Sequence, residues 1–332
     1  MKKILIPKSD LMISRLGLGG LHFGSFTTAS ESKKIINKSL DGGINFIETA
    51  AMYGNNQSSR IIGNILKEKR KNIILSYKVG LEPKHKRNLF KCKIIKLDQK
   101  YINQKTNEGL RNLQTDWIDI FQIHAFDYKT NILDLLDAIC KLIKFGKIRY
   151  FGFANLEKTQ LIDIFKTKHP VLKKLLTAQF QFNILERKAE RHFFKYCKKK
   201  NLSILFNQVF ARGLLLNKYI DSKNLPKQSR AFLSSSLRAQ LNHKIFAFSN
   251  DLEFLAESMN IKLTNMLLSW TMKKYANSIC ILGFSKTKQV HDYNKIHLYE
   301  NFAELDYQIT KLIKKNGYSK IIYNRPQKFI NI

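Results

Sequence analysis

Residues 43–54 read GINFIETAAMYG, and the interpretation of the whole chain starts from this stretch. Its first half is short, apolar and β-prone, which indicates a buried strand over residues 45–48. The strand ends at the carboxylate of Glu48, and Tyr53 follows in a turn that closes at Gly54. Polar groups at the ends of buried strands are where active sites of parallel α/β barrels lie. Glu48 and Tyr53 are therefore candidate functional residues.

Similar apolar runs recur outward from this stretch, separated by lysine-rich segments of helical periodicity. Strands are predicted at residues 16–19, 45–48, 73–78, 117–124, 150–154, 178–181, 203–206 and 280–283. Amphipathic helices are predicted at residues 30–41, 58–69, 133–145, 190–200 and 252–259, and Gly146 is placed to end one of them. Alternating strands and helices imply a parallel sheet, because each parallel connection needs a long crossover. Eight units over 332 residues predict one α/β domain spanning residues 1–332, a (β/α)8 TIM barrel.

A doubly wound dinucleotide fold is not indicated. The glycines of residues 16–24, LGLGGLHFG, lack the GxGxxG spacing, and no acidic residue ends a strand about twenty residues later. The longest interval between predicted strands begins with a loop over residues 207–244. Because long loops in compact domains are more often functional than idle, this loop is predicted to fold over a cofactor.

The formal charge of +33 is the most unusual bulk property. Basic runs at residues 67–71, 84–87, 198–200 and 314–315 are spread along the chain, so nucleic acid is not expected as a partner. A nucleic-acid binder driven by charge is the alternative, which the salt dependence of binding would test.

The remaining bulk features point to a cytoplasmic protein. No membrane segment is expected, because no apolar run approaches roughly 18 residues, and no secretion signal is recognisable. The cysteines stand singly, without metal-ligand spacing, so reduced thiols and no metal site are predicted: Cys92, Cys140, Cys197 and Cys280.

Four polar residues at neighbouring strand ends form a coherent set for carbonyl reduction: Glu48, Tyr53, Lys78 and His124. A phenol with a pKa near 10 is a weak acid, but a neighbouring ammonium favours its phenolate, and a carboxylate can hold that ammonium. Tyr53, Lys78 and Glu48 are predicted to form such a relay. His124 would hydrogen-bond the carbonyl oxygen, as a neutral donor or as a cation.

The chain resembles the aldo-keto reductase family nearly from end to end. Residues 43–54 look like the family's GxNxxDTAxxYG segment, and residues 117–124, 146–155, 179–187, 213–219 and 281–286 look like its later blocks, in order. The resemblance implies NADPH-dependent reduction of an aldehyde, ketone or sugar carbonyl to an alcohol, with Tyr53 as general acid. The family's catalytic aspartate, tyrosine, lysine and histidine fall on Glu48, Tyr53, Lys78 and His124.

The resemblance also implies a set of cofactor-binding residues. Asn155 and Gln179 match residues that bind the nicotinamide carboxamide, and Gly213 and Leu214 match the pyrophosphate loop. The block that holds the adenosine phosphate corresponds to Gly283, Ser285, Lys286, Gln289 and Asp292. A lysine in this block would pair with a 2′-phosphate and favour NADPH over NADH.

Three departures from the family pattern motivate a second hypothesis. Glu48 stands where the family has aspartate, Ala154 replaces the serine before Asn155, and residues 206–210, FNQVF, replace the usual Tyr/Trp-Ser-Pro-Leu. These changes allow a catalytically weakened, NADPH-binding regulatory or scaffolding protein with the same fold.

The substrate is scarcely readable from the sequence. His22 and Phe23, after the first strand, are pocket-wall candidates by position. The loop over residues 80–98 carries Lys84, His85, Lys86 and Arg87 and would suit an anionic substrate, although a solvated basic loop is the alternative. The pathway, the direction of reaction and the oligomeric state are not predicted.

Overall fold

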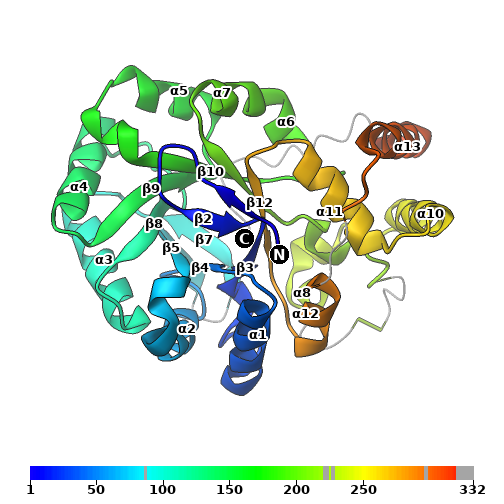
Figure 1. Cartoon of the computed structure of the whole chain (residues 1–332), viewed down its shortest axis with the longest axis horizontal. Coiled ribbons are helices and arrows are strands. Elements are labelled where there is room, and N and C mark those ends of the chain that lie inside the picture. The colour runs from blue at the N-terminus through cyan, green and yellow to red at the C-terminus, as the bar shows by residue number, and fades with distance from the viewer. Residues whose placement is uncertain (86–87, 220–223, 226–228, 295–297, 319–332) are drawn as a thin grey trace.

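The central sheet of the computed structural model is a closed barrel of eight parallel strands (Figure 1). In order around the cylinder they are β3 (Leu16–Gly19), β4 (Phe46–Ala50), β5 (Ile74–Val79), β8 (Ile118–Ile123), β9 (Ile148–Ala154), β10 (Leu175–Gln181), β11 (Ser203–Asn207) and β12 (Ser278–Leu282). The predicted (β/α)8 fold and all eight predicted strands are confirmed, with ends that differ by a few residues. The structure describes residues 1–85, 88–219, 224–225, 229–294 and 298–318, apart from the side chains at 68, 85, 88–91, 292 and 294.

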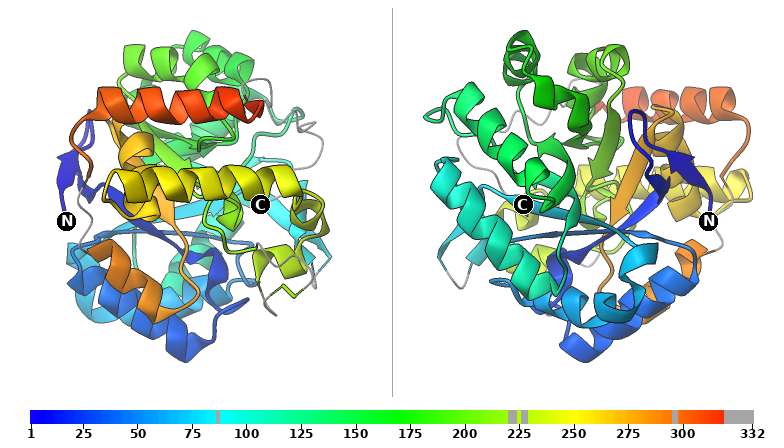
Figure 2. Two further views of the ribbon diagram at one scale, coloured as in Figure 1. Left: turned by 90° about the vertical axis from the view of Figure 1, so that its right-hand side faces the viewer. Right: turned by 60° about the vertical axis from the view of Figure 1, so that its left-hand side comes forward.

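Helices form an outer ring around the barrel (Figures 1 and 2). They are α1 (Ala29–Asp41), α2 (Gln57–Lys69), α3 (Gln99–Leu113), α4 (Ile132–Lys144), α5 (Lys158–Lys166), α6 (Lys188–His192), α7 (Phe194–Lys199), α8 (Arg230–Leu233), α9 (Ser235–Arg238), α10 (His243–Ser258), α11 (Leu263–Lys273), α12 (Thr287–Asn294) and α13 (Phe302–Lys315). Short 3-10 helices lie at η1 (Gly20–His22), η2 (Arg70–Asn72), η3 (Pro170–Lys174) and η4 (Ala211–Gly213).

Local signals account for several of the helix ends. The Thr28 side chain accepts a hydrogen bond from the Glu31 amide at the start of α1, and Asn131 does the same for Leu133 at the start of α4. Such caps satisfy amides that have no partner inside the helix. Gly146, with φ of +68°, follows the end of α4, as its place in the sequence predicts.

Two predicted segments differ from the structure. The helix expected over residues 190–200 is broken into α6 and α7 at Phe193, and the one expected over residues 252–259 is the end of the longer α10. The break places two adjacent rings on the sheet: Phe193 stacks on Phe180 at a centroid distance of 4.2 Å, and Phe194 meets Phe182 at 5.2 Å. Neighbouring positions of an unbroken helix point about 100° apart, whereas at this break both rings contact residues at the end of β10, Phe180 within the strand and Phe182 just after it.

The segment over residues 207–244, predicted as a loop, also contains helices. Its described parts contain η4, α8 and α9, and α10 begins within it. Two hairpins also escaped prediction: β1 (Lys3–Leu5) with β2 (Met12–Ser14), and β6 (Leu81–His85) with β7 (Asn88–Ile94). The β6–β7 hairpin belongs to the predicted basic loop, of which Lys86, Arg87 and the His85 side chain lie outside the described residues.

The β1–β2 hairpin closes the N-terminal end of the barrel and lies across it in Figure 1. Ile6, Leu11 and Ile13 pack in one buried cluster with residues of the barrel strands, among them Phe46 and Leu205. A separate and larger core lies between the strands and the helices. Apolar layers therefore fill the lower part of the barrel, which leaves the site for the opposite end.

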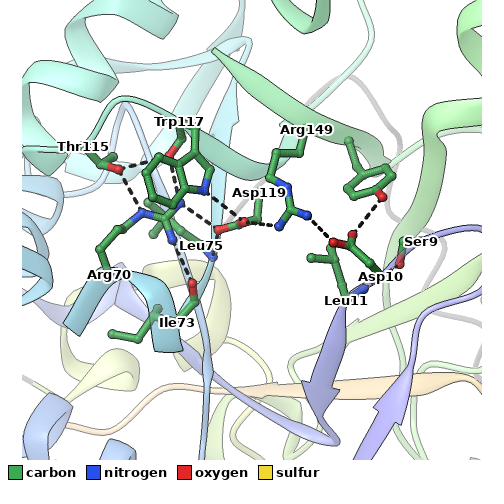
Figure 3. Close-up of polar contacts among 11 residues, drawn as sticks. Ser9, Asp10, Leu11, Arg70, Ile73, Leu75, Thr115, Trp117, Asp119 and Arg149 are labelled. Carbon is green, nitrogen blue, oxygen red and sulfur yellow. Dashed lines mark hydrogen bonds and ion pairs between the residues drawn. The ribbon is translucent and has the colours of Figure 1, made fainter. Parts of the chain in front are cut away.

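A polar network near Asp119 joins this base to the hairpin (Figure 3). Asp119 is 2% exposed and accepts hydrogen bonds from Arg70 (2.8 Å), the Leu75 amide (2.9 Å), Trp117 (3.2 Å) and Arg149 (3.0 Å). Arg149 also pairs with Asp10 of the hairpin at 2.6 Å, and the Tyr150 hydroxyl donates to Asp10 at 2.9 Å. The network ties β5, β8, β9 and the hairpin together.

Candidate active site

The four predicted catalytic residues lie together at the C-terminal end of the barrel. Glu48 is in β4, Lys78 is in β5, and His124 directly follows β8, so neighbouring strands supply them. Tyr53 lies in the turn after β4, where its amide bonds to the Ala50 carbonyl. All four side chains are buried, with exposed fractions between 2% and 5%.

Their contacts form a continuous chain. The Lys78 ammonium makes an ion pair with Glu48 Oε1 and a hydrogen bond with the Tyr53 hydroxyl. Lys78 Nζ also lies 5.0 Å from the centroid of the Tyr53 ring. The Tyr53 and His124 rings meet edge to face, with centroids 5.9 Å apart and an interplanar angle of 82°. The sequence-predicted relay therefore exists as a set of contacts.

Burial and charge set the protonation of this group. Burial lowers the pKa of the Lys78 ammonium, but the charge of Glu48 and the contact with Tyr53 outweigh it, so the net direction is upward. Burial raises the pKa of the Tyr53 hydroxyl, and the nearby ammonium of Lys78 only partly opposes this. Burial, reinforced by Lys78, lowers the pKa of His124 well below its usual value. At neutral pH Lys78 is charged, whereas Tyr53 and His124 are neutral.

The second oxygen of Glu48 is held by two glutamine amides. Glu48 Oε2 accepts hydrogen bonds from Gln179 Nε2 at 2.8 Å and from Gln122 Nε2 at 3.0 Å. Gln122 Nε2 also donates to Ser76 Oγ at 2.7 Å. The extra methylene of Glu48 thus does not break the contact with Lys78, and the carboxylate spans β4, β5, β8 and β10.

A cavity of about 230 Å³ opens beside these residues. Its wall includes Glu48, Tyr53 and Lys78 as well as Ser285 and Gln289. Other lining residues are Asn207, Gln208, Arg212, Gly213, Lys218, Arg230 and Gly283. One cavity is therefore lined both by predicted catalytic residues and by residues of the block predicted to hold the adenosine phosphate.

The predicted carboxamide-binding residues lie beside His124. The Asn155 amide bonds to the Gln179 carbonyl at 3.1 Å, and Asn155 Nδ2 donates to the His124 carbonyl at 2.9 Å. Asn155 is left-handed, with φ of +55°. Gln179 is 1% exposed, and its Oε1 is buried without a hydrogen-bond partner in the described chain.

The other predicted cofactor residues are divided between the cavity and its surroundings. Gly213 and Gly283 line the cavity, but the Leu214 side chain belongs to the buried core and is not part of the cavity wall. Gly213 has φ of +97°, and a Cβ there would lie 3.1 Å from the Tyr219 ring. Asp292 belongs to α12, and its side chain lies outside the described residues.

The start of α12 is held by side chains of the chain itself. Gln289 Oε1 accepts from the amides of Ser285 (2.8 Å) and Lys286 (3.1 Å) and from Ser285 Oγ (3.3 Å). Glu31 of α1 accepts from the amide and the hydroxyl of Thr287 at 2.7 and 2.8 Å. The Lys286 side chain is exposed beside this turn, within electrostatic reach of Lys218.

The two pocket-wall candidates have different environments. His22 lines the cavity, with a buried Nδ1 that has no partner among the described residues. Burial, with the charges of Arg230 and Lys218, lowers the pKa of His22 to about 3. Phe23 is fully buried in the core between strands and helices and is absent from the cavity wall. Position alone did not distinguish the two, because they are adjacent but face opposite ways.

Sequence reasoning missed three residues of this site. Gln122 carried a usable signal, since a polar residue inside an apolar strand run needs a buried partner. Asn207 follows Phe206, whose ring packs into the core against Phe182 at 4.7 Å, so Asn207 rather than the aromatic residue lines the cavity. Arg230 reaches the cavity from α8, and no local sequence pattern predicts this.

The described residues contain neither a helix long and apolar enough to span a membrane nor a group of three His, Cys, Asp or Glu side chains that could hold a metal ion. A closed parallel barrel with a buried tyrosine, lysine, histidine and carboxylate at its C-terminal mouth is typical of a class of proteins: oxidoreductases that interconvert carbonyl and alcohol groups.

Comparisons with known proteins are consistent with this class. The model of the aldo/keto reductase family matches residues 15–314. The chain is 28% identical over 298 residues to the aldo-keto reductase YhdN of Bacillus subtilis, covering 88% of this chain and 87% of that protein. It is 25% identical over 292 residues to the oxidoreductase YqkF of the same organism, covering 88% and 90%.

The fold is also similar to that of a solved dehydrogenase structure. The glycerol dehydrogenase AKR11B4 from Gluconobacter oxydans superposes with a TM-score of 0.82 at 27% identity, covering 96% of this chain and 97% of that one. The chain belongs to the aldo/keto reductase family, and it is an oxidoreductase acting on carbonyl or alcohol groups.

Proposed function

We propose that the protein uses NADPH to reduce an aldehyde, ketone or sugar carbonyl to an alcohol, with Tyr53 as the proton donor. The observation that carries this proposal is the buried chain Glu48–Lys78–Tyr53, which opens onto the cavity beside His124. NADPH supplies the hydride. The substrate is a small molecule, and the protein acts in the cytoplasm, where its free thiols stay reduced.

The cavity has the features that a nicotinamide dinucleotide needs. Asn207 lines the cavity, and its Oδ1 is a buried acceptor without a partner in the described chain, as is Oε1 of Gln179, which contacts Glu48. Lys218 and Arg230 lie along the wall, where they suit a pyrophosphate. Lys286, exposed next to Ser285 of the cavity wall, suits a 2′-phosphate.

Further residues hold the same cofactor in this proposal. They are Asn155, Gly213, Gly283, Ser285 and Gln289, with the described parts of the segment over residues 207–244 as its cover.

The protonation states suit proton donation to a carbonyl oxygen. Because burial raises the pKa of Tyr53, the hydroxyl keeps its proton until a substrate oxygen develops negative charge. When that O–H bond breaks, the phenolate that remains is stabilised by the Lys78 ammonium, which Glu48 holds in place. His124 is neutral and donates one N–H to the same oxygen, which polarises the carbonyl.

The substitution Tyr53→Phe tests this assignment. It removes the acidic proton while keeping the ring against His124, so kcat for NADPH-dependent reduction should fall by roughly a hundredfold to ten-thousandfold. The dissociation constant for NADPH and the melting temperature should change little. NADPH oxidation across a panel of carbonyl compounds measures the effect, and equal turnover by both proteins would refute the role of Tyr53.

The alternative is an NADPH-binding regulatory or scaffolding protein without turnover. The three departures from the family pattern motivate it, but the contact of Glu48 with Lys78 weighs against the most serious of them. NADPH binding with no turnover on any carbonyl compound, unrepaired by Glu48→Asp, would favour this alternative.

A further inference from the structure

Basic side chains gather around the N-terminal end of the barrel. A helix that returns the chain to the start of a parallel strand has to end there, and α2, α4, α5, α7 and α11 each carry a lysine in the last turn. The helix dipole favours a cation at such a position. This ring of lysines therefore does not indicate a partner by itself.

One sector of this end, next to the β1–β2 hairpin, carries more basic residues than the helix ends alone. Lys8 Nζ in the hairpin turn donates to the carbonyl of Leu175 at 2.7 Å and to that of Lys200 at 3.3 Å. Asp10 in the same turn pairs with Arg149 at 2.6 Å (Figure 3). These contacts bring together four segments, which we call the basal patch: residues 2–12, 144–149, 166–175 and 198–201.

The charge of the basal patch is almost uniformly positive. Asp10 is the only acidic residue of its four segments, all of which the structure describes, and Arg149 and the Tyr150 hydroxyl already bind it. Every segment contributes exposed lysines, among them Lys3, Lys144, Lys173, Lys174, Lys198 and Lys199. Lys3 lies on a strand, where no helix dipole accounts for it. A surface of this kind attracts an anionic partner.

Apolar side chains are exposed within the same patch. Leu5 and Met12 are cross-strand partners in the hairpin and are 55% and 48% exposed, whereas Ile13 next to Met12 is fully buried. The hairpin therefore presents one apolar face to the barrel and a second to solvent. Phe145, which ends α4, is 74% exposed. Single exposed apolar residues are common, but a pair and a phenyl ring among lysines leave apolar surface for a partner to cover.

An anionic lipid surface matches both properties of the patch. Its headgroup phosphates attract lysines close to the surface, and the boundary with the acyl chains accepts apolar side chains such as Leu5, Met12 and Phe145. Nucleic acid would also attract the lysines, but its affinity comes from phosphate contacts and leaves the apolar side chains in water. A second copy of this face would be repelled by its like charge.

We propose that the basal patch docks the protein on an anionic phospholipid bilayer, with its lysines at the headgroups and Leu5, Met12 and Phe145 at the acyl boundary. The protein then lies on the bilayer and does not span it. The catalytic residues are at the opposite end of the barrel, so the cavity stays open to the aqueous phase. This inference goes beyond the proposed function and does not depend on it.

Co-sedimentation of the full chain with vesicles of phosphatidylglycerol and phosphatidylcholine in equal parts, compared with phosphatidylcholine alone, tests the charge. At roughly 0.1 M salt, where charges are screened over about 10 Å, wild type should bind the anionic vesicles at least about a hundredfold more tightly. The double substitution Lys3→Gln, Lys173→Gln should weaken this binding about twentyfold, since each lysine near the surface contributes about fivefold.

The matched control for the lysines is the double substitution Lys100→Gln, Lys158→Gln. Both residues are exposed in the first turns of α3 and α5, which lie at the opposite end of the barrel. The variant loses the same charge from the chain, but binding to the anionic vesicles should change by less than about threefold.

A second comparison tests the apolar contact. Phe145→Ser should weaken binding to the anionic vesicles roughly tenfold, and Phe145→Leu should retain most of it. Tyr128 is 72% exposed in the loop before the same helix α4, at the opposite end of the barrel, so Tyr128→Ser is the control and should bind like wild type. The replaced side chains are all exposed, and melting temperatures check that the variants fold.

Wild type that binds anionic and neutral vesicles equally, or wild-type binding by the Lys3, Lys173 variant or by Phe145→Ser, would overturn the proposal. A short RNA duplex at the same salt is the competing ligand. If it bound more tightly than the vesicles, and equally to wild type and Phe145→Ser, the patch would be a nucleic-acid interface instead. Either result would leave the proposed function intact, because NADPH oxidation is measured without vesicles.

Discussion

The barrel buries one carboxylate near each of its ends, and the side chains that bind these two carboxylates differ in how completely they are hydrogen-bonded. At the base, Asp119 accepts from four donors, and none of its side-chain partners Arg70, Trp117 and Arg149 is left with a buried unpaired atom within the described chain. At the mouth, Glu48 is held by Lys78, Gln122 and Gln179, but each glutamine keeps a buried oxygen without a partner there.

This difference indicates that the network at the base contributes to stability, whereas the network at the mouth serves function. A satisfied buried network fixes the strands, and breaking it leaves charges uncompensated. An unsatisfied one costs stability, because each buried polar atom without a partner loses its hydrogen bonds to water. Such a cost is retained where a ligand later supplies the missing partner, as expected at the C-terminal end of a barrel.

The largest expected effect lies at the base. Asp119→Ala leaves Arg70 and Arg149 without their shared partner and should lower the free energy of unfolding by about 3–5 kcal/mol, with kcat of the folded protein unchanged. Urea unfolding measures the free energy of unfolding, and NADPH oxidation at low temperature measures kcat. Asp10→Ala, which removes an exposed partner of Arg149, is the control and should cost less than about 1 kcal/mol. A fall in kcat for folded Asp119→Ala would show that the two ends are coupled.

Acid should act on the mouth first. The pKa values of His22 and His124 are lowered in the folded state, so the unfolded state binds more protons below its own pKa near 6.5, and stability falls as the pH drops. Between pH 7 and pH 5 His22 should cost about 2 kcal/mol of unfolding free energy, and His124 should add to the loss in the same direction.

Urea titrations at the two pH values measure this loss, and His22→Asn should remove the share of His22. If the variant and wild type lost equal stability over this interval, His22 would not be a buried neutral group, and the contrast between the ends would weaken.

The smallest expected effect is that of Lys286 on nucleotide binding. Lys286→Ala should weaken NADPH binding roughly fivefold and leave NADH binding unchanged, because an exposed lysine contributes about 1 kcal/mol to a phosphate contact. Fluorescence titration with the two nucleotides gives the ratio. Lys288→Ala, two residues further along in the first turn of α12 and also exposed, should leave it unchanged. If both variants lost the same affinity for NADPH, the cause would be the overall positive charge of this surface rather than a contact of Lys286 with the 2′-phosphate.

The sequence predicted the barrel, and the grouping of Glu48, Tyr53, Lys78 and His124 at one end of it, because both depend on local signals. Each strand was a short apolar run, and Glu48, Lys78 and His124 were polar residues at or after the ends of such runs, which parallel strands bring to one edge. The β1–β2 hairpin was missed because strands of three residues carry almost no periodicity.

The remaining errors arise from long-range packing. Phe23 was indistinguishable from His22 in sequence, since which of two neighbours faces a cavity depends on elements packed from elsewhere. Arg230 joins the cavity from a helix far along the chain. The contact of Glu48 with Gln179 also required coordinates, because the two residues are 131 positions apart.

The hairpin that closes the base has a consequence for the order of events in turnover. The side chains of Ile6, Leu11 and Ile13 fill the N-terminal end of the barrel. Ligands therefore enter the barrel through its C-terminal end. Nucleotide and carbonyl compound must then share an entrance, so the partner that sits deeper has to arrive first and depart last.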